Sequence, residues 1–268
     1  MKEYINWQEM LLPYNQAINE LVTKFRCLSD GFNSLSDSSP IEQVEGRVKN
    51  ASSILQKAGR KGIPLGEIES KIEDIAGVRI ICRFVNDIQD VVGLIRERNG
   101  LDMEIVTERD YISNIKRSGY RSYHIIIRYP VVTALGKKSV LCEIQIRTLA
   151  MNFWAVIEHS LKYKYRGQLP AHIQERLRRS AEASLTLDDE IREIREEIIE
   201  AESSMLERIS VVDEILKNVQ LLHKLGRLDE VSAINASFFK LYESGTIDQL
   251  TELCRQAQAA ADQYGGSL

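Results

Sequence analysis

The first third of the chain alternates between helical and loop-forming patterns. Apolar residues recur at helical spacing through residues 4–28, interrupted by Pro13, which predicts two short helices or one kinked helix. Turn-forming residues at 34–40 (SLSDSSP) predict a loop. A second helix is expected from Ile41 to about Gly59, and a short one at 65–73.

Three short runs rich in β-branched residues predict strands. They are GVRIICRFV at 77–85, HIIIRY at 124–129 and VLCEIQIR at 140–147. Between the first two, residues 88–98 have the pattern of a crossover helix. The alternation predicts an α/β (α+β) fold, with a mixed sheet flanked by helices over roughly residues 40–165.

The chain after Pro170 has a different character. It contains no further proline, and its apolar positions recur every three or four residues, which predicts helices with breaks near Gly226 and Gly245. The stretch DDEIREIREEIIE at 188–200 is typical of a solvated acidic helix with one narrow packing stripe. We expect a helical extension that serves assembly or partner contact.

Composition and charge narrow the class of protein. A chain of 268 residues, 44% hydrophobic and 28% charged, can bury one sizeable core, and its net charge of −4 argues against general coating of nucleic acid. The four cysteines are widely spaced, which suggests neither a disulfide framework nor a zinc site. With no apolar run long enough to span a bilayer and no signal-peptide pattern, the cytoplasm is the expected location.

Positive charge is concentrated in residues 46–66, which hold five Lys and Arg residues and no Asp or Glu. On the expected helix, Lys49, Ser53, Lys57 and Arg60 fall on one face. Lysines act as mobile point charges and arginines grip oxygens bidentately, so this array suits a polyphosphate. The alternative is a solvated basic face.

Two carboxylates are candidates for a magnesium site. Asp74 lies just ahead of a predicted strand, and alternation places Glu143, Gln145 and Arg147 on one face of another. Magnesium takes one or two protein carboxylates and fills its octahedron with phosphate oxygens and water. Alternatively, Glu143 lies on the wet face of a half-exposed sheet.

The segment KRSGYRSYH at 116–124 offers a nucleoside-binding loop. Gly119 can bend the chain, and Tyr120 and His124 then lie on the same side of an extended segment. A tyrosine ring can stack on a purine, and a histidine near Lys116 can donate to phosphate oxygens. A core tyrosine with a satisfied histidine is the alternative, so these patterns alone reach a nucleotide-binding α/β domain.

Five motifs together resemble the synthetase domain of the RelA/SpoT family. They are GRVKNASSILQK at 46–57, EDIAGVRIICRF at 73–84, DYI at 110–112, KRSGYRSYH at 116–124 and EIQIRTLAMNFWAVIEH at 143–159. The likeness is strongest to the short RelQ-type members called small alarmone synthetases. It implies a nucleotidyltransferase-like synthetase domain with terminal assembly helices in residues 1–200, and leaves residues 201–268 as a helical extension of unknown role.

The resemblance also implies an activity and residue roles. Family members transfer the β,γ-pyrophosphate of ATP to the ribose 3′-OH of GTP or GDP with Mg²⁺ and release AMP. Asp74 and Glu143 would bind the metal, and Glu143 would also take the proton from the 3′-OH. The residues implied for ATP are Arg47, Lys49, Ser53, Lys57, Arg60, Arg79 and Arg109. Those implied for the guanine nucleotide are Lys116, Tyr120, His124, Gln145 and Asn152.

The resemblance further implies a homotetramer, regulation by product or single-stranded RNA, and no contact with a membrane. Long family members carry a hydrolase domain ahead of the synthetase, but only 46 residues precede Arg47, so we expect no hydrolysis of the product. Two competing functions remain open at this point. One is nucleotidyl transfer to a nucleic acid on a related fold, and the other is a catalytically silent regulator that binds an alarmone or RNA.

Overall fold

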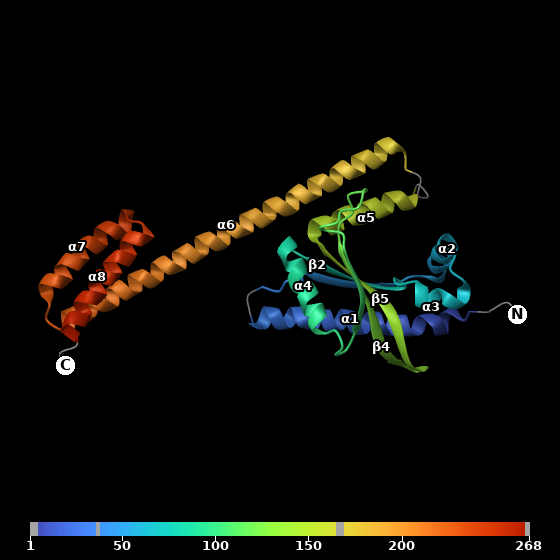
Figure 1. Ribbon diagram of the computed structural model, residues 1–268, viewed down its shortest axis with the longest axis horizontal. Coiled ribbons are helices and arrows are strands. Elements are labelled where there is room, and N and C mark those ends of the chain that lie inside the picture. The colour runs from blue at the N-terminus through green and yellow to red at the C-terminus, as the bar shows by residue number, and fades with distance from the viewer. Residues whose placement is uncertain (1–4, 36–37, 165–168, 266–268) are drawn as a thin grey trace. The chain divides into compact units, whose positions relative to one another are not determined.

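A computed structural model of the chain describes residues 5–35, 38–164 and 169–265. The chain divides into two compact units, Met1–Arg192 and Glu193–Leu268. The first unit contains a β-sheet with helices, and the second is helical (Figure 1). Among the described residues, no helix combines the length and apolar composition needed to cross a bilayer.

The first unit is organised around a five-stranded mixed sheet. Its strands are β1 (Gln43–Val48), β2 (Ala76–Cys82), β3 (Glu104–Asp110), β4 (Tyr123–Thr133) and β5 (Gly136–Thr148). Their order across the sheet is β1-β2-β5-β4-β3, with β2 and β5 parallel and the other neighbours antiparallel. The predicted mixed sheet flanked by helices is therefore confirmed.

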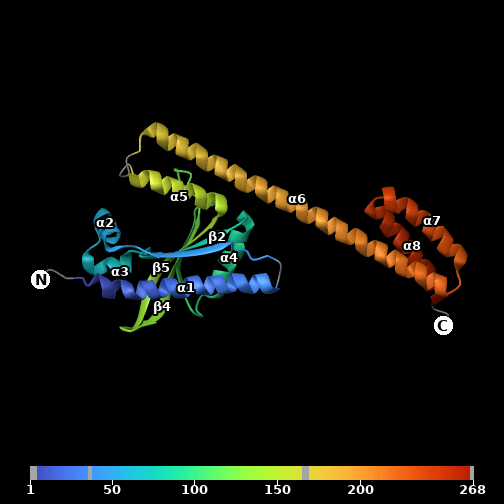
Figure 2. The same cartoon turned by 180° about the vertical axis from the view of Figure 1, so that it is seen from behind.

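Helices cover both faces of this sheet. Helix α1 (Trp7–Leu35) runs along one face, and α5 (Leu149–Lys164) lies on the opposite side (Figures 1 and 2). Tyr14, Leu21 and Phe25 of α1 are fully buried in the main core, where they meet the inward side chains of the strands and of α4 (Val85–Glu97). Fully burying each such side chain contributes about 1.5–3 kcal/mol. The expected crossover helix corresponds to α4.

Helix α1 is longer than expected. The sequence predicts two helices or a kinked one ending near residue 28, whereas the structure has one helix of 29 residues with Pro13 inside it. Proline removes one backbone donor from the helix. Here Pro13 is itself buried against the core, and packing of α1 on the sheet outweighs the local cost of the missing hydrogen bond.

The expected helix from Ile41 to about Gly59 is wrong in its first half. Residues 43–48 form β1, and α2 spans Ala51–Lys61 after the Asn50 cap, whose side chain accepts from the Ser53 N–H at 2.9 Å. Residues 43–48 are held as a strand by antiparallel pairing with β2. At Gly46 this strand passes close to α1, because a Cβ there would lie 2.5 Å from Ile18.

Two further elements complete the first unit. Strand β3 was not predicted, because its sequence EIVTERD carries charges along an exposed sheet edge. The short helix expected at 65–73 is present as a 3₁₀ turn at Leu65–Glu67 followed by α3 (Ile68–Lys71).

The second unit is built from helices. Helix α6 (Ala171–Lys224) begins in the first unit and ends in the second, where α7 (Leu228–Ser244) and α8 (Ile247–Gly265) follow. The predicted breaks near Gly226 and Gly245 are confirmed. Ile215, Leu222 and Leu250 are fully buried in a separate core.

Candidate active site

The register of the sheet places the polar site residues in two rows on the face opposite the main core. One row runs Arg47–Gly77–Glu143–Ile126 across β1, β2, β5 and β4, and the next runs Glu45–Arg79–Gln145–His124–Arg109. Residues directly opposite each other across neighbouring strands share a face. The predicted alternation in β5 is therefore confirmed, since Cys142, Ile144 and Ile146 lie in the core.

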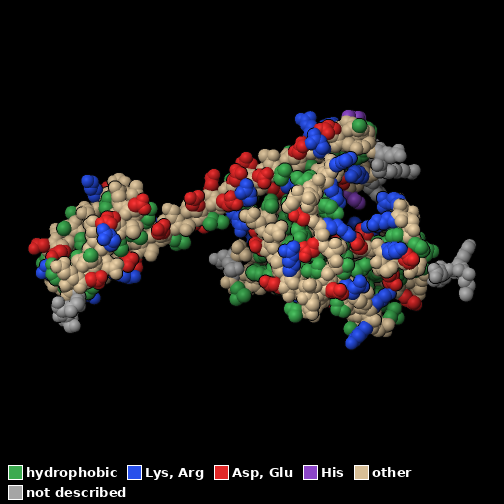
Figure 3. Space-filling view, in the orientation of Figure 1, with side chains coloured by type: hydrophobic (Ala, Val, Ile, Leu, Met, Phe, Trp, Pro, Cys, Tyr) green, Lys and Arg blue, Asp and Glu red, His purple; other side chains and the backbone are tan. Residues whose placement is uncertain are grey.

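A cleft of about 350 Å³ opens over the β1–β2–β5 side of these rows. In the space-filling view, Lys and Arg side chains gather around the hollow between α5 and α2 (Figure 3). Five cations face three carboxylates and two further polar side chains in this cleft. The charged and polar lining residues are Arg47, Lys49, Lys57, Arg60, Arg79, Glu45, Asp74, Glu143, Gln145 and His159.

The five cations reach the cleft from β1, β2, α2 and the connection before α2, so the expectation of one helical face is wrong in detail. Arg47 lies on β1, Arg79 lies on β2, Lys49 lies in the connection before α2, and Lys57 and Arg60 lie on α2. The strand and the capped helix converge here because β1 pairs with β2 beside Glu143 of β5.

Asp74 is clamped by two lysines. Its Oδ2 accepts from Lys49 Nζ at 2.7 Å and from Lys57 Nζ at 2.5 Å, and the three side chains are 15–23% exposed. Burial would raise the pKa of Asp74, but the hydrogen bonds and charges of both lysines outweigh it and hold the pKa below its ordinary value. Asp74 is therefore ionised at neutral pH and organises the cation array.

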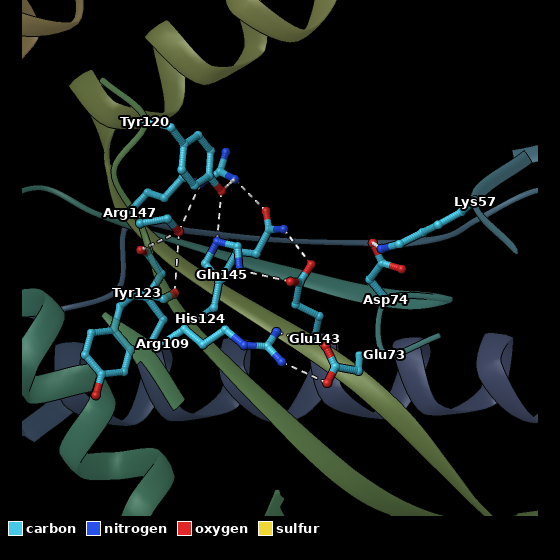
Figure 4. A network of polar contacts seen from close by, with 12 residues as sticks. Lys57, Glu73, Asp74, Arg109, Tyr120, Tyr123, His124, Glu143, Gln145 and Arg147 are labelled. Atoms are coloured by element: carbon cyan, nitrogen blue, oxygen red, sulfur yellow. Dashed lines mark hydrogen bonds and ion pairs between the residues drawn. The ribbon is translucent and has the colours of Figure 1, made fainter. Parts of the chain in front are cut away.

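Glu143 lies at the centre of a hydrogen-bonded chain of polar side chains (Figure 4). Its Oε1 lies 2.9 Å from His124 Nδ1, and its Oε2 accepts from Gln145 Nε2 at 2.7 Å. Burial and the charge of Asp74 both act to raise the pKa of Glu143, yet hydrogen bonds from His124 and Gln145 keep it below its ordinary value. An ionised carboxylate can only accept, so Nδ1 of His124 carries the proton and donates.

The chain of hydrogen bonds continues from His124 to Tyr120, in the loop before β4. Nε2 of His124 lies 2.8 Å from the Tyr120 hydroxyl, and that hydroxyl also accepts from Arg147 at 2.5 Å. Burial raises the pKa of Tyr120, so the hydroxyl keeps its proton. The hydrogen bonds that run from Arg147 through Tyr120 and His124 to Glu143 therefore hold these four side chains in one arrangement.

Lys116 lies over two aromatic rings beside this chain. Its Nζ is 3.8 Å from the centroid of the Tyr111 ring and 4.9 Å from that of Tyr120. Burial is the main reason why the pKa of Lys116 is lowered, with the charges of Arg109 and Arg147 acting in the same direction. A cation with neighbouring cations is suited to receive an anionic ligand.

Six of the site residues named from the sequence do not line the cleft. Lys116, Tyr120 and His124 lie in the polar network described above, and the other three are Ser53, Arg109 and Asn152. Ser53 is half-buried in α2, and Arg109 forms a bidentate ion pair with Glu73, both bonds 2.8 Å long. Asn152 lies in the first turn of α5, and its Oδ1 is buried without a hydrogen-bond partner among the described residues.

Sequence reasoning missed several side chains that complete the site. Arg147 was seen on the polar face of β5 but given no role, although it bonds to Tyr120 and to Gln145 at 2.6 Å. Tyr111 and His159 lie within the quoted motifs DYI and EIQIRTLAMNFWAVIEH, which could have drawn attention to them. Glu45, an ion-pair partner of Arg79 at 3.4 Å, had no sequence signal.

The donor set fits magnesium. Asp74 Oδ1 is buried and has no hydrogen-bond partner among the described residues, and Glu143 lines the same cleft. One or two carboxylates are what Mg²⁺ takes from a protein when phosphate oxygens supply further ligands. Cations for a polyphosphate, carboxylates for a metal and an aromatic loop thus meet on one face of the sheet.

Comparisons with known proteins agree with this arrangement. Residues 46–168 match the region found in RelA/SpoT proteins. GTP pyrophosphokinase YjbM of Bacillus subtilis (strain 168) is 52% identical over 198 residues, which are 74% of this chain and 92% of that protein.

Solved structures give the same result. Small alarmone synthetase 1 from Bacillus subtilis bound to its product pppGpp has a TM-score of 0.69 and 53% identity, covering 72% of this chain and 97% of that one. The same synthetase bound to AMPCPP has a TM-score of 0.64 and 49% identity, covering 72% and 98%. The predicted resemblance is confirmed, and the chain belongs to the RelA/SpoT family.

Proposed function

We propose that this protein is a GTP pyrophosphokinase that synthesises pppGpp from ATP and GTP, or ppGpp from ATP and GDP. The observation that carries the proposal is the cleft itself, where five cations and the two carboxylates Asp74 and Glu143 lie on one face of the sheet. The relative bound to pppGpp and the relative bound to AMPCPP support a guanine-nucleotide product and an adenine-nucleotide donor.

The donor nucleotide occupies the basic side of the cleft in this proposal. Lys49 and Lys57 meet the phosphates as point charges, while Arg47, Arg60 and Arg79 offer planar forks that grip phosphate oxygens and stack on the adenine. Phosphoryl-type transfer depends chiefly on positioning and charge stabilisation, so a preset array of this kind is the main requirement. By the family resemblance, Ser53 also binds the ATP phosphates. Arg109, which is paired with Glu73, also faces the ATP.

The acceptor nucleotide lies on the Tyr120 side. The Tyr120 ring stacks on guanine, and Lys116, His124, Gln145 and Asn152 surround the nucleotide and its phosphates. The ribose 3′-oxygen attacks the β-phosphorus of ATP, a new O–P bond forms, the bond from that phosphorus to the α-phosphate oxygen breaks, and AMP leaves. Glu143 accepts the 3′-OH proton.

Asp74 and Glu143 would hold a magnesium ion, which neutralises charge on the transferred phosphates when it is bound. Asp74 Oδ1 is suited to this role because its partner atom Oδ2 already serves both lysines. We also propose a cytoplasmic homotetramer, open to regulation by product or single-stranded RNA, as the family resemblance implies.

The test is incubation of the purified protein with Mg²⁺, labelled ATP and GTP, followed by separation of the products. The proposal expects labelled pppGpp and AMP in equal amounts, with neither formed when GTP is left out. Binding of both nucleotides without product would refute the proposed activity and support a silent regulator. Release of pyrophosphate with a nucleotide joined to nucleic acid would instead indicate nucleotidyl transfer.

A further inference from the structure

Asp188 is a buried carboxylate on α6 that the proposed reaction does not use. It pairs with Arg121 NH2 at 3.1 Å, and the two side chains are 5% and 4% exposed. Burial raises the pKa of Asp188, and the side chains of Thr148 and Arg121 oppose that rise. Asp188 lies 67 residues from Arg121 in the sequence, so the pair ties α6 to a distant part of the first unit.

The residues that Asp188 contacts belong to the framework of the site. Arg121 directly follows Tyr120 in the loop before β4, and Thr148 ends β5, the strand of Glu143. The Thr148 hydroxyl oxygen also accepts from the Met151 N–H at 3.1 Å, at the start of α5. Asp188 therefore ties α6 to the Tyr120 loop, and the Thr148 side chain that acts on its charge also caps the start of α5.

Two further contacts hold the same loop against α6. Tyr120 packs on a cluster of Trp154, Ala155 and Ala181, and Trp154 Nε1 donates to the Leu177 carbonyl oxygen at 3.0 Å. A Cβ on Gly119 would lie 2.4 Å from Cβ of Ala181, so the loop touches the helix at a glycine. Positions 177, 181 and 188 share one face of a helix, and that face forms a wall behind the loop.

Stability alone does not explain a buried ion pair at this place. Taking two charges out of water costs free energy, and replacing such a pair by apolar residues of similar volume is often neutral or stabilising. What an ion pair with directed hydrogen bonds adds is a fixed geometry. The geometry fixed here is that of Tyr120, whose ring and hydroxyl both have to be placed.

We infer that the Arg121–Asp188 ion pair is a positioning element for the acceptor nucleotide, holding the loop of Lys116 and Tyr120 in its binding arrangement from behind. The inference rests on the proposed function, in which this loop receives the guanine nucleotide. Neither residue lines the cation-rich cleft, so the pair acts on the acceptor and leaves the ATP site as it is.

The test compares Asp188→Asn with Asp189→Asn in the full chain. Both substitutions remove one negative charge from the same turn of α6, but Asp189 is exposed and Asp188 is buried. Calorimetry with GDP and with AMPCPP measures the two sites without turnover, and KM for GTP and for ATP follows in the synthesis assay. Circular dichroism melts establish that each variant is folded.

For Asp188→Asn we expect GDP binding weakened by about tenfold or more, because small misplacements of a binding group are costly, and a matching rise in KM for GTP. Affinity for AMPCPP and KM for ATP stay within about twofold of wild type, because the substitution misplaces no group that binds ATP. Asp189→Asn behaves as wild type in every measurement. This split separates a positioning role from a general loss of structure.

A folded Asp188→Asn variant with unchanged GDP affinity would overturn the inference, and so would an equal loss of affinity for both nucleotides. If that variant does not fold, Arg121→Lys takes its place, because it keeps both charges and loses the planar fork. Unchanged GDP affinity in Arg121→Lys would then overturn the inference. The proposed function is tested separately, on the wild-type protein. It would be refuted if wild-type protein neither binds GDP nor forms pppGpp.

Discussion

Replacing Glu143 by glutamine separates its role as a base from its role in the hydrogen-bonded chain. Both carboxylate oxygens accept, one from His124 and the other from Gln145. A glutamine offers one acceptor oxygen and one NH₂ group. Either the His124 N–H or the Gln145 NH₂ group would therefore face the NH₂ group of the new side chain, which is also a donor. The oxygen of Gln145 cannot rescue the contact by turning, because it already accepts from Arg147 at 2.6 Å.

The structural cost of Glu143→Gln is therefore one buried hydrogen bond, about 1–3 kcal/mol. In a protein of this size each kcal/mol lowers the melting temperature by about 2–4 °C. The catalytic cost is larger, since a positioned general base is worth about 10²–10⁴ in rate, or about 2.7–5.4 kcal/mol at 1.36 kcal/mol per tenfold. Loss of a metal-binding oxygen adds to it.

The assay is pppGpp formation by folded protein with both nucleotides saturating, beside a melt of each variant. Glu104→Gln on β3 is the matched control, because that side chain is 67% exposed on the same sheet. We expect wild-type turnover from Glu104→Gln and a fall of at least about 10² from Glu143→Gln. Turnover of Glu143→Gln within about threefold of wild type would refute the assignment of Glu143 as the base.

Three further predictions concern the cations, the acceptor loop and acid. Lys57→Met is expected to raise KM for ATP about tenfold or more by removing a charge-assisted contact, with KM for GTP unchanged; Lys61→Met on the same helix, outside the cleft, should leave both as they are. Gly119→Ala combines a left-handed φ of 84° with a clash against α6, whereas Gly136→Ala combines a φ of 97° with open space. Both variants should lose about 1–2 kcal/mol of unfolding free energy, but Gly119→Ala should lose more and also raise KM for GTP. Asp74 has a lowered pKa in the folded protein, so its contribution to stability is complete above its ordinary value of 3.8 and is lost as pH falls through the folded pKa. Urea unfolding should therefore show Asp74→Asn less stable than wild type near neutral pH, and a shrinking difference in acid.

The central strands and their polar face were within reach of sequence reasoning. Strand β2 and the central parts of β4 and β5 are rich in β-branched residues and buried on one face, so periodicity and composition agree at each of them. The alternation in β5 was enough to place Glu143 and Gln145 on the site face. Asp74 could be placed too, because a residue just ahead of a strand lies near the edge of the sheet.

The edge strands and the pairing across the sheet were not accessible in the same way. The sequence of β1 and α2 resembles one continuous helix, so the boundary between them could not be predicted. The residues that mark this boundary are Gly46, which lies against α1, and Asn50, which caps α2. Strand β3 is polar because it lies at an edge. The meeting of Arg121 with Asp188 depends on how α6 packs behind the loop, which no local pattern encodes.

Asp74 and Glu143 are both half-buried in the cleft and both kept ionised, but by different partners, and this difference divides their roles. Asp74 is neutralised by two ammonium groups on one oxygen, which leaves the other oxygen to an additional cation and makes the group a poor proton acceptor. Glu143 is held by one imidazole and one amide, and within the described part of the chain no ammonium or guanidinium group is bound to either oxygen. Pairs of titratable groups in contrasting surroundings commonly carry different parts of a reaction. A proton from an attacking hydroxyl is therefore better received by Glu143, while Asp74 fixes the lysines and the metal that face the phosphates.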